Sequence, residues 1–519
     1  MRRVFVVCGI ALLTLAFLCF ISRVPMVHAW VGTVYIRSDG RIEPVGAPIN
    51  TTDGIVYKLW DNISVNSFMA KGIVIERDNI ILDGNGFTVY GSQSQLTTGV
   101  DLGQRNNVTV KNLNVEGHAF GINLYQSVNI KVQACNITGN NWGIDLKYSN
   151  SSMISENSLA DNGLAIRLGS SSTHNFILRN NVTGAGSGIV IQENCNFTII
   201  SENYLNGSFS VTASGIAVSA SENKILRNTI TAYGASDISL SYATKNLIYG
   251  NNITFSGSGV DLHENADNNT IAGNMIAFNG FGIYIYMASY NRIYHNWFYQ
   301  NGVDIEVDDG VINYFDGGYP MGGNYWLGYS RADVYHGPNQ DQEGSDGIID
   351  QPYQTSYGIV DRYPLLAPPA PLPLITIDGL TYIIEIMSNS TVSDLYINPE
   401  EGPFIKFNVS GLDGTIGFSR VIIPKEFLWT ENCWVITING QAVTYALELS
   451  DTENTYLYFT YTHSTKTVTI QGTNIIPEYP TITSPILLLL ITTLITITRS
   501  KKQKTSHDIK NRYFYISVS

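Results

Sequence analysis

The sequence predicts an all-β protein built around a right-handed parallel β-helix of about eleven rungs, and two repeating patterns predict it. The first is a glycine–aliphatic–any–aliphatic tetrad, such as Gly121-Ile122-Asn123-Leu124, which returns every 22 to 27 residues. The tetrads begin at Gly72, Gly99, Gly121, Gly143, Ala165, Gly188, Gly215, Asp237, Gly259, Gly282 and Asp304. A repeat of short period-two strands cannot bury its apolar face alone, so it must stack on its neighbours.

The second pattern is an isoleucine followed three residues later by an asparagine. The asparagines are Asn157, Asn180, Asn203, Asn228, Asn251, Asn274 and Asn296, at steps of 22 to 25 residues. Stacked amides can hydrogen-bond to the rungs above and below, and asparagine tolerates the left-handed backbone of a tight corner. Two strands per rung are therefore clear, and the remaining residues supply corners and a weaker third strand.

Export signals precede the repeats. Residues 1–29 contain an apolar run behind two arginines and end in Val27-His28-Ala29, which predicts a signal peptide cleaved after Ala29. An uncleaved anchor is the alternative, because the apolar run is long for a signal peptide. Residues 30–71 then carry strand-like pieces and are predicted to cap the open end of the helix at residues 72–313.

The period is lost after the helix. Residues 314–368 are rich in Gly, Tyr, Asp and Pro and are predicted to form a C-terminal capping loop. Residues 369–475 contain short alternating strands, and Asn439-Gly440 is a type I′ hairpin signal, so a small antiparallel β-sandwich is expected.

A C-terminal membrane anchor is also predicted. Residues 476–481 form a linker, residues 482–498 form an apolar run of spanning length, and residues 499–519 are basic. The basic flank predicts a C-terminal transmembrane helix with a cytoplasmic tail, and an extracytoplasmic position for everything before it. Twelve Asn-x-Ser/Thr sequons are consistent with a glycosylated exterior.

The charge of the exported part limits its partners. Residues 30–498 carry 21 basic and 42 acidic side chains, a formal net charge of −21, against −13 for the whole chain. Such a surface argues against nucleic acid or an anionic membrane surface as a partner and is compatible with divalent cations.

Several segments resemble the NosD-like family of exported right-handed β-helix proteins, especially its archaeal surface relatives. The segments span residues 32–36, 78–84, 322–326, 344–353 and 361–365, among them Gly322-Gly323-Asn324-Tyr325-Trp326. The resemblance covers about residues 30–368, and the sandwich and anchor are also typical of those relatives. The family name implies copper handling during maturation of nitrous oxide reductase. A related superfamily of such helices binds or cleaves carbohydrates, which is an analogy of fold.

Copper is not favoured by the residues themselves, because its sites need clustered His, Met or Cys ligands. The histidines after the signal occupy different phases of the repeat: His118, His174, His263, His295, His336 and His463. Of the three cysteines there, Cys135 takes the place of an asparagine in the ladder and is expected to be buried. Three thiols far apart predict neither a disulfide framework nor a zinc site.

Calcium is a stronger candidate cation. Asp341, Glu343, Asp346 and Asp350 place four carboxylates within ten residues, with glycines for sharp turns. Hard cations take several oxygen ligands from such loops, although the spacing differs from an EF-hand.

The outward faces of the tetrad strands provide the candidate ligand-binding surface. The aliphatic residues of each tetrad point inward, so the residue between them and the residue after the tetrad point outward. Stacking then predicts two polar clusters, which we call the N-terminal cluster (Asp101, Tyr125, Asp145, Lys147 and Arg167) and the C-terminal cluster (Asp261, His263, Tyr284, Tyr286 and Glu306). An ordinary solvated face is the alternative for both.

Three functions remain open from the sequence. The leading one is a membrane-anchored surface protein that binds glycans or other surface polymers without catalysis. The second is a polysaccharide-processing enzyme (a lyase, hydrolase or epimerase) on the same face, with Asp261, His263 and Glu306 as catalytic candidates. The third is a metal-handling accessory protein of the NosD type.

Overall fold

The computed structural model describes residues 29–475 except 209–211, 309, 356–357, 378–379, 432 and 444–446. The chain divides into two compact units, one ending at Pro371 and the other beginning at Leu372, and each is described by itself. Within the described residues no helix is long and apolar enough to cross a membrane. The predicted signal (apart from Ala29) and the predicted span at residues 482–498 lie outside the described residues.

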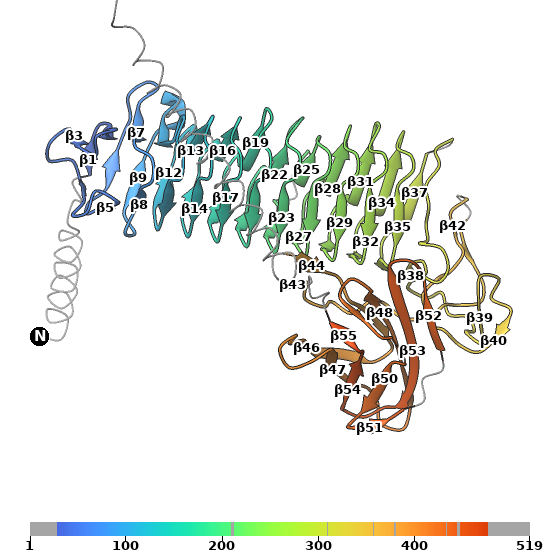
Figure 1. Ribbon diagram of the computed structural model, residues 1–519. Coiled ribbons are helices and arrows are strands. Elements are labelled where there is room, and N and C mark those ends of the chain that lie inside the picture. The colour runs from blue at the N-terminus through green and yellow to red at the C-terminus, as the bar shows by residue number, and fades with distance from the viewer. Residues whose placement is uncertain are drawn as a thin grey trace, which may run out of the picture. The chain divides into compact units, whose positions relative to one another are not determined.

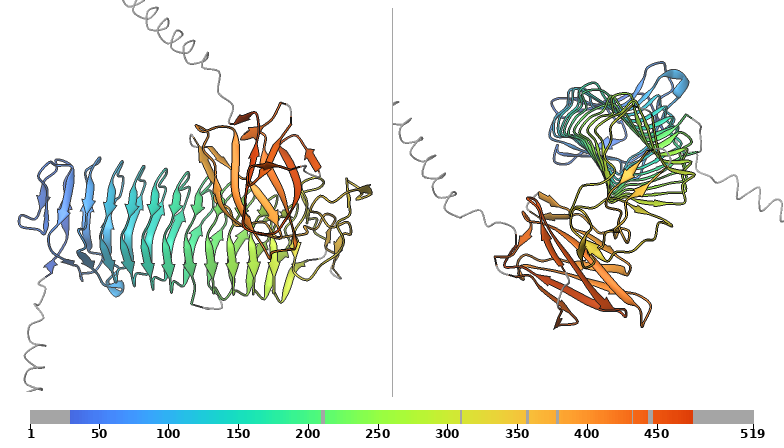
Figure 2. Two further views of the ribbon diagram at one scale, coloured as in Figure 1. Left: turned by 90° about the horizontal axis from the view of Figure 1, so that it is seen from below. Right: turned by 90° about the vertical axis from the view of Figure 1, so that its right-hand side faces the viewer.

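The first unit is a parallel β-helix of about eleven turns, as the tetrads predict (Figure 1). Its rungs stack along one axis, and the view along that axis shows their outlines superimposed (Figure 2). Three long sheets run the length of the stack, and each rung contributes one short strand to each sheet. The predicted all-β architecture and the parallel β-helix are therefore confirmed.

The tetrads form the first sheet, which we call the tetrad sheet. In sequence order its strands are β2 (Val34–Ile36), β3 (Ile42–Glu43), β7 (Lys71–Ile75), β10 (Thr98–Asp101), β13 (Phe120–Tyr125), β16 (Trp142–Lys147), β19 (Leu164–Gly169), β22 (Ser187–Ile191), β25 (Ser214–Val218), β28 (Ser236–Ser241), β31 (Ser258–His263), β34 (Phe281–Tyr286) and β37 (Val303–Val307). All neighbours pair in parallel except β3, which is antiparallel to β2 at the N-terminal edge.

The isoleucines of the second pattern form the second sheet. Its strands are β4 (Ile49–Asn50), β5 (Val56–Leu59), β8 (Ile81–Asp83), β11 (Thr109–Lys111), β14 (Lys131–Gln133), β17 (Met153–Ser155), β20 (Phe176–Leu178), β23 (Ile199–Ser201), β26 (Lys224–Leu226), β29 (Leu247–Tyr249), β32 (Thr270–Ala272) and β35 (Arg292–Tyr294).

The third sheet, expected to be weaker, is as continuous as the other two. Its strands are β1 (Trp30–Val31), β6 (Ile63–Ser64), β9 (Thr88–Tyr90), β12 (Asn114–Glu116), β15 (Asn136–Thr138), β18 (Ser158–Ala160), β21 (Asn181–Thr183), β24 (Tyr204–Asn206), β27 (Thr229–Thr231), β30 (Asn252–Thr254), β33 (Met275–Ala277), β36 (Trp297–Tyr299) and β38 (Tyr325–Trp326). A short 3₁₀ helix, Gln93–Gln95, lies in the loop between β9 and β10.

The ends of the stack differ from a simple cap. Before Gly72 the chain already contributes β2, β5 and β6 to the three sheets, each paired in parallel with the first tetrad rung. At the other end β38 extends the third sheet. Two hairpins follow, β39 (Tyr335–His336) with β40 (Gln342–Glu343), and β41 (Tyr353–Gln354) with β42 (Val360–Asp361).

The inward aliphatic residues of the rungs form one continuous core. Ile122, Leu124 and Ile154 are completely buried, as are their equivalents in most other rungs. Full burial of such a side chain stabilises the fold by about 1.5–3 kcal/mol. The glycine that begins each tetrad has a steric cause, since a Cβ on Gly121 would lie 2.4 Å from the carbonyl oxygen of Gly143 in the next rung.

The asparagine ladder is confirmed, although its backbone role differs from the expectation. The side-chain oxygen of Asn251 accepts hydrogen bonds from the backbone N–H (2.8 Å) and the Nδ2 (3.0 Å) of Asn228. The Nδ2 of Asn251 in turn donates to Asn274 at 2.9 Å. The left-handed residue of each corner is the one before the ladder asparagine, for example Arg227 with φ 53°. The ladder asparagines are therefore selected for their amides and not for a left-handed backbone.

The second unit contains two antiparallel sheets that contribute to one apolar core. One sheet has the order β45 (Glu385–Ser388), β48 (Ile416–Pro424), β53 (Asn454–Thr462), β52 (Leu447–Ser450); the other has the order β46 (Thr391–Tyr396), β47 (Phe404–Ser410), β54 (Lys466–Gln471), β50 (Val435–Ile438), β51 (Gln441–Ala442). Two small pairs complete the unit, β43 (Ile375–Ile377) with β44 (Leu380–Tyr382) and β49 (Leu428–Trp429) with β55 (Asn474–Ile475). Asn439 and Gly440 both have positive φ (51° and 78°) between β50 and β51, as a type I′ turn requires.

Candidate functional site

The outward residues of the tetrad sheet stand in register. Asp145 pairs with Asn123 on one side and with Arg167 on the other, and Tyr284 pairs with Asp261 and Glu306. The column after the tetrads is also aligned, with Tyr125 opposite Lys147 and His263 opposite Tyr286. Both predicted clusters are therefore assembled by strands that lie side by side.

In the N-terminal cluster, Arg167, Asp145 and Asp101 are paired with neighbouring side chains. Arg167 donates from Nε and Nη2 to the two carboxylate oxygens of Asp145, at 2.6 and 2.8 Å. The Arg167 guanidinium lies 3.9 Å from the ring centre of Trp142. Asp101 accepts hydrogen bonds from Lys71 Nζ and Asn123 Nδ2. Asp101, Asp145 and Arg167 therefore already have partners, whereas no described residue hydrogen-bonds to Lys147 Nζ or to the Tyr125 hydroxyl.

The C-terminal cluster is more open. His263 Nε2 lies 3.2 Å from Asp261 Oδ1, at ion-pair distance. The His263 ring contacts two tyrosines, with centroid separations of 5.9 Å to Tyr284 and 5.5 Å to Tyr286. No described residue hydrogen-bonds to the hydroxyls of these tyrosines or to the carboxylate of Glu306. The cluster therefore offers two aromatic faces beside polar groups that have no partners among the described residues.

The electrostatics of the C-terminal cluster follow from partial burial. Desolvation raises the pKa of Asp261 above its ordinary value, and the positive charge of protonated His263 opposes this shift. The pKa of the Tyr284 phenol is also raised, first by desolvation and then by the carboxylates of Glu306 and Asp261. Desolvation thus disfavours the charged forms of Asp261 and Tyr284.

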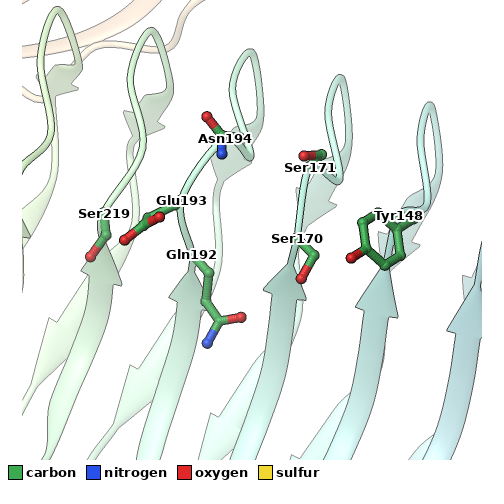
Figure 3. A pocket seen from close by; sticks show the side chains of 7 residues that line it. All are labelled: Tyr148, Ser170, Ser171, Gln192, Glu193, Asn194 and Ser219. Atoms are coloured by element: carbon green, nitrogen blue, oxygen red, sulfur yellow. The ribbon is translucent and has the colours of Figure 1, made fainter.

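A third feature, a polar hollow of about 520 Å³, was not predicted from the sequence. It lies where β16, β19, β22 and β25 end, in the turns that follow them (Figure 3). The residues that line it are Tyr148, Ser170, Ser171, Gln192, Glu193, Asn194 and Ser219. The outward columns contain Gln192 and Ser219, but the hollow depends on turn lengths and on the missing side chain of Gly169, which no repeat pattern reveals.

Among the described residues, no group of three or more His, Cys, Asp or Glu side chains could hold a metal ion. His118 is completely buried and is used structurally: its ring nitrogens lie 3.0 Å from Thr97 Oγ1 and 3.1 Å from the carbonyl oxygen of Val89. Burial also lowers the pKa of His118 to about 4. Cys135 is buried in the ladder as expected, and burial raises its pKa to about 12.

The four predicted calcium ligands are likewise not gathered into a metal-holding group. Asp341 and Glu343 are exposed, whereas Asp346 is buried. Asp350 accepts backbone hydrogen bonds from Val334 and Tyr335 at 3.1–3.2 Å. Asp350 thus fixes the backbone of this segment, and calcium has no support from the geometry of the four residues.

The similarity to a known protein family lies in the β-helix. The family model described as "Periplasmic copper-binding protein (NosD)" matches residues 45–214 and 206–331. No protein of curated function matches the chain in sequence.

Three solved structures match part of this chain. The A-module of mannuronan C-5 epimerase AlgE4 from Azotobacter vinelandii is 17% identical, with 50% of this chain and 80% of that chain covered and a TM-score of 0.38. The periplasmic alginate epimerase AlgG is 14% identical, with coverages of 51% and 78% and a TM-score of 0.37. Tailspike protein 3 of bacteriophage CBA120 is 12% identical, with coverages of 59% and 56% and a TM-score of 0.33. Similarity at this level carries no information on function.

Proposed function

This chain belongs to the NosD family, and on that premise we propose that its β-helix binds glycans or other surface polymers without catalysis. The observation that carries the proposal is the C-terminal cluster. There Tyr284 and Tyr286 present aromatic faces on one rung, next to Asp261 and His263 on the rung before and Glu306 on the rung after. Aromatic faces suit the apolar faces of sugar rings, and unpaired polar groups suit their hydroxyls.

The repeat also suits a polymer. Neighbouring rungs lie about 4.8 Å apart, which is similar to the length of one sugar unit in an extended chain. Several rungs can therefore contact successive units of one chain that lies along the helix axis.

A polysaccharide-processing enzyme is the second candidate, and one observation favours it. Asp261 has a raised pKa and lies at ion-pair distance from His263, as a proton-transferring pair requires. Glu306, however, stands two rungs from Asp261, so their backbones are about 10 Å apart along the axis. Retaining glycosidases need carboxylates only about 5–5.5 Å apart. The strand register alone therefore does not bring the two carboxylates to that spacing.

The cellular position is part of the proposal. We infer an extracytoplasmic protein held at the membrane by residues 482–498, because the family is described as periplasmic and the apolar run has a basic flank. Its copper-binding description is not transferred to this chain, since the described residues gather no copper ligands.

Binding of the detergent-solubilised, full-length protein to a glycan array tests the function. We expect binding to at least one polymer, and expect the Tyr284→Ala/Tyr286→Ala variant to lose it with an unchanged melting temperature. Tyr204→Ala is the matched control, because Tyr204 is an exposed aromatic residue on the third sheet. Retained binding in the double variant would contradict the proposal, and release of reducing ends or unsaturated products would favour the enzyme instead.

A further inference from the structure

The polar hollow is built by four consecutive turns on the outside of the helix. Figure 3 shows Tyr148 at one end and Ser219 at the other, with Ser170, Gln192 and Glu193 between them. Each turn follows a strand of the tetrad sheet, so the rigid rungs hold the lining at fixed spacing. Sites on such regular elements are positioned more accurately than sites on long loops.

Turn length and a missing side chain create the space. The turn after β22 spans residues 192–198, whereas the turn after β16 spans only residues 148–152. Gly169 precedes the lining residue Ser170, and a Cβ there would lie 2.8 Å from Gln192 Oε1, so the Gln192 side chain occupies space that a larger residue at position 169 would fill. Ser170 and Ser171 follow with two successive left-handed conformations, φ 47° and 62°.

The lining is chemically specific. It contains three hydroxyls from serine, two amides, one carboxylate and the phenol of Tyr148, and no basic residue. None of these seven side chains makes a hydrogen bond to any residue that the structure describes. Hydroxyls and amides both donate and accept, and the Glu193 carboxylate can accept from two neighbouring hydroxyls. The ring of Tyr148, 43% exposed, adds one apolar face.

We propose that the hollow is a binding subsite for one or two uncharged sugar units. Its volume lies within the range of small-molecule sites, and its donors and acceptors match a polyhydroxylated ring. A uronic acid is disfavoured because Glu193 and the negative exported surface repel it. The inference rests on the proposed function for the class of ligand, but the hollow is separate from the C-terminal cluster, so the two can fail independently.

The test measures binding of three trisaccharides to the detergent-solubilised full-length protein by saturation-transfer NMR and titration. The probes are cellotriose and maltotriose, which are uncharged, and trigalacturonate. We expect at least one uncharged probe to bind and trigalacturonate to bind at least about tenfold more weakly. Equal binding of the acidic probe, or no binding of either uncharged probe, would overturn the inference.

Variants locate the binding. Ser219→Trp should fill the hollow and abolish trisaccharide binding, and Glu193→Gln should weaken it about tenfold by removing a charge-assisted hydrogen bond. Ser241→Trp is the control, since Ser241 stands one rung beyond Ser219 in the same column and does not line the hollow. Melting curves check that each variant folds. If trisaccharide binding is lost in Tyr284→Ala/Tyr286→Ala and kept in Ser219→Trp, the sugar binds at the C-terminal cluster: the hollow is excluded while the proposed function stands.

Discussion

Arg167 donates two parallel hydrogen bonds to Asp145 of the preceding rung, and its guanidinium lies 3.9 Å from the ring centre of Trp142. Asp145 is only 3% exposed, so this pair holds a charge that would otherwise be buried without a partner. Fork-to-carboxylate geometry of this kind is available to arginine and not to lysine. Two residues of a predicted ligand-binding cluster thus form an ion pair that links neighbouring rungs.

The first prediction concerns this ion pair. Arg167→Leu should lower the free energy of unfolding by about 3–5 kcal/mol, because it leaves the buried Asp145 carboxylate unpaired. Arg167→Leu/Asp145→Leu should recover most of the loss. Urea denaturation of both variants measures the effect, and Arg179→Leu is the control, because Arg179 and its partner Glu156 are both about half exposed. Equal losses of unfolding free energy in Arg167→Leu and Arg179→Leu would contradict a stabilising role for the Arg167–Asp145 ion pair.

The second prediction concerns the asparagine ladder. Asn251→Ala removes the acceptor of two hydrogen bonds from Asn228 and leaves buried donors unsatisfied, so it should cost about 1–3 kcal/mol. Asn136→Ala, at an exposed position on β15, should change stability by less than about 0.5 kcal/mol. Thermal melts followed by circular dichroism compare the two. A ladder without energetic weight would give equal melting temperatures.

The third prediction concerns the glycine of the tetrad. Gly121→Ala should destabilise the protein by about 1–3 kcal/mol, because the new Cβ would overlap the Gly143 carbonyl oxygen of the next rung. Gly103→Ala is the matched control, since its Cβ would meet only Asp101 Oδ1, at 3.8 Å. The midpoints of urea unfolding of the two variants measure the difference in stability. An unchanged midpoint in Gly121→Ala would show that the neighbouring rung can move to accommodate a Cβ at position 121.

The fourth prediction concerns pH. Asp237 replaces a tetrad glycine and is completely buried. Desolvation raises its pKa to about 8, against about 3.9 in an unfolded chain. The folded protein therefore holds a proton that the unfolded chain releases, so this contribution to stability is full below about pH 4 and is lost as the pH rises to about 8.

Asp237→Asn tests this assignment, because asparagine mimics the neutral acid and does not titrate. Melting temperatures measured from pH 4 to pH 9 should fall less steeply in the variant, with the largest gain over the parent at the alkaline end. Asp78→Asn, at an exposed position, should keep the slope of the parent. Parallel curves for the parent and Asp237→Asn would show that Asp237 is ionised in the folded protein.

The fifth prediction concerns the anchor. If residues 482–498 cross the membrane, the full chain should stay with membranes after carbonate extraction, and a chain ending at residue 481 should be released. Protease added to intact cells should remove the β-helix and spare an epitope placed after Lys504. Release of the full chain by carbonate would exclude the anchor.

Sequence periodicity was sufficient for the rungs and their register because both patterns repeat at one site per rung. The inward position of Ile154 and the ladder position of Asn157 follow directly from that periodicity, and both are observed. The left-handed corner was assigned to Asn157, whereas Glu156 occupies it with φ 59°. A period alone cannot distinguish adjacent corner positions, since residues as different from asparagine as Glu156, Arg179 and Arg227 adopt that conformation in this protein.

The candidate site was only partly predictable for a different reason. Spacing placed Asp145 and Arg167 on one face, but it could not show that they neutralise each other. The hollow was missed because it arises from what Gly169 lacks and from small differences in turn length. Such features depend on the three-dimensional arrangement of several rungs and leave no repeated signature in the chain.

The asparagine ladder also bears on how this protein can change over evolutionary time. Asn251 receives from Asn228 the same two hydrogen bonds that it gives to Asn274. A whole turn copied or removed at this point would bring together two edges that already match, in amides and in inward aliphatic residues. The molecule can therefore gain or lose complete turns while its interior contacts stay the same. The length of polymer that its outer face can contact would then depend on the number of turns that have been duplicated.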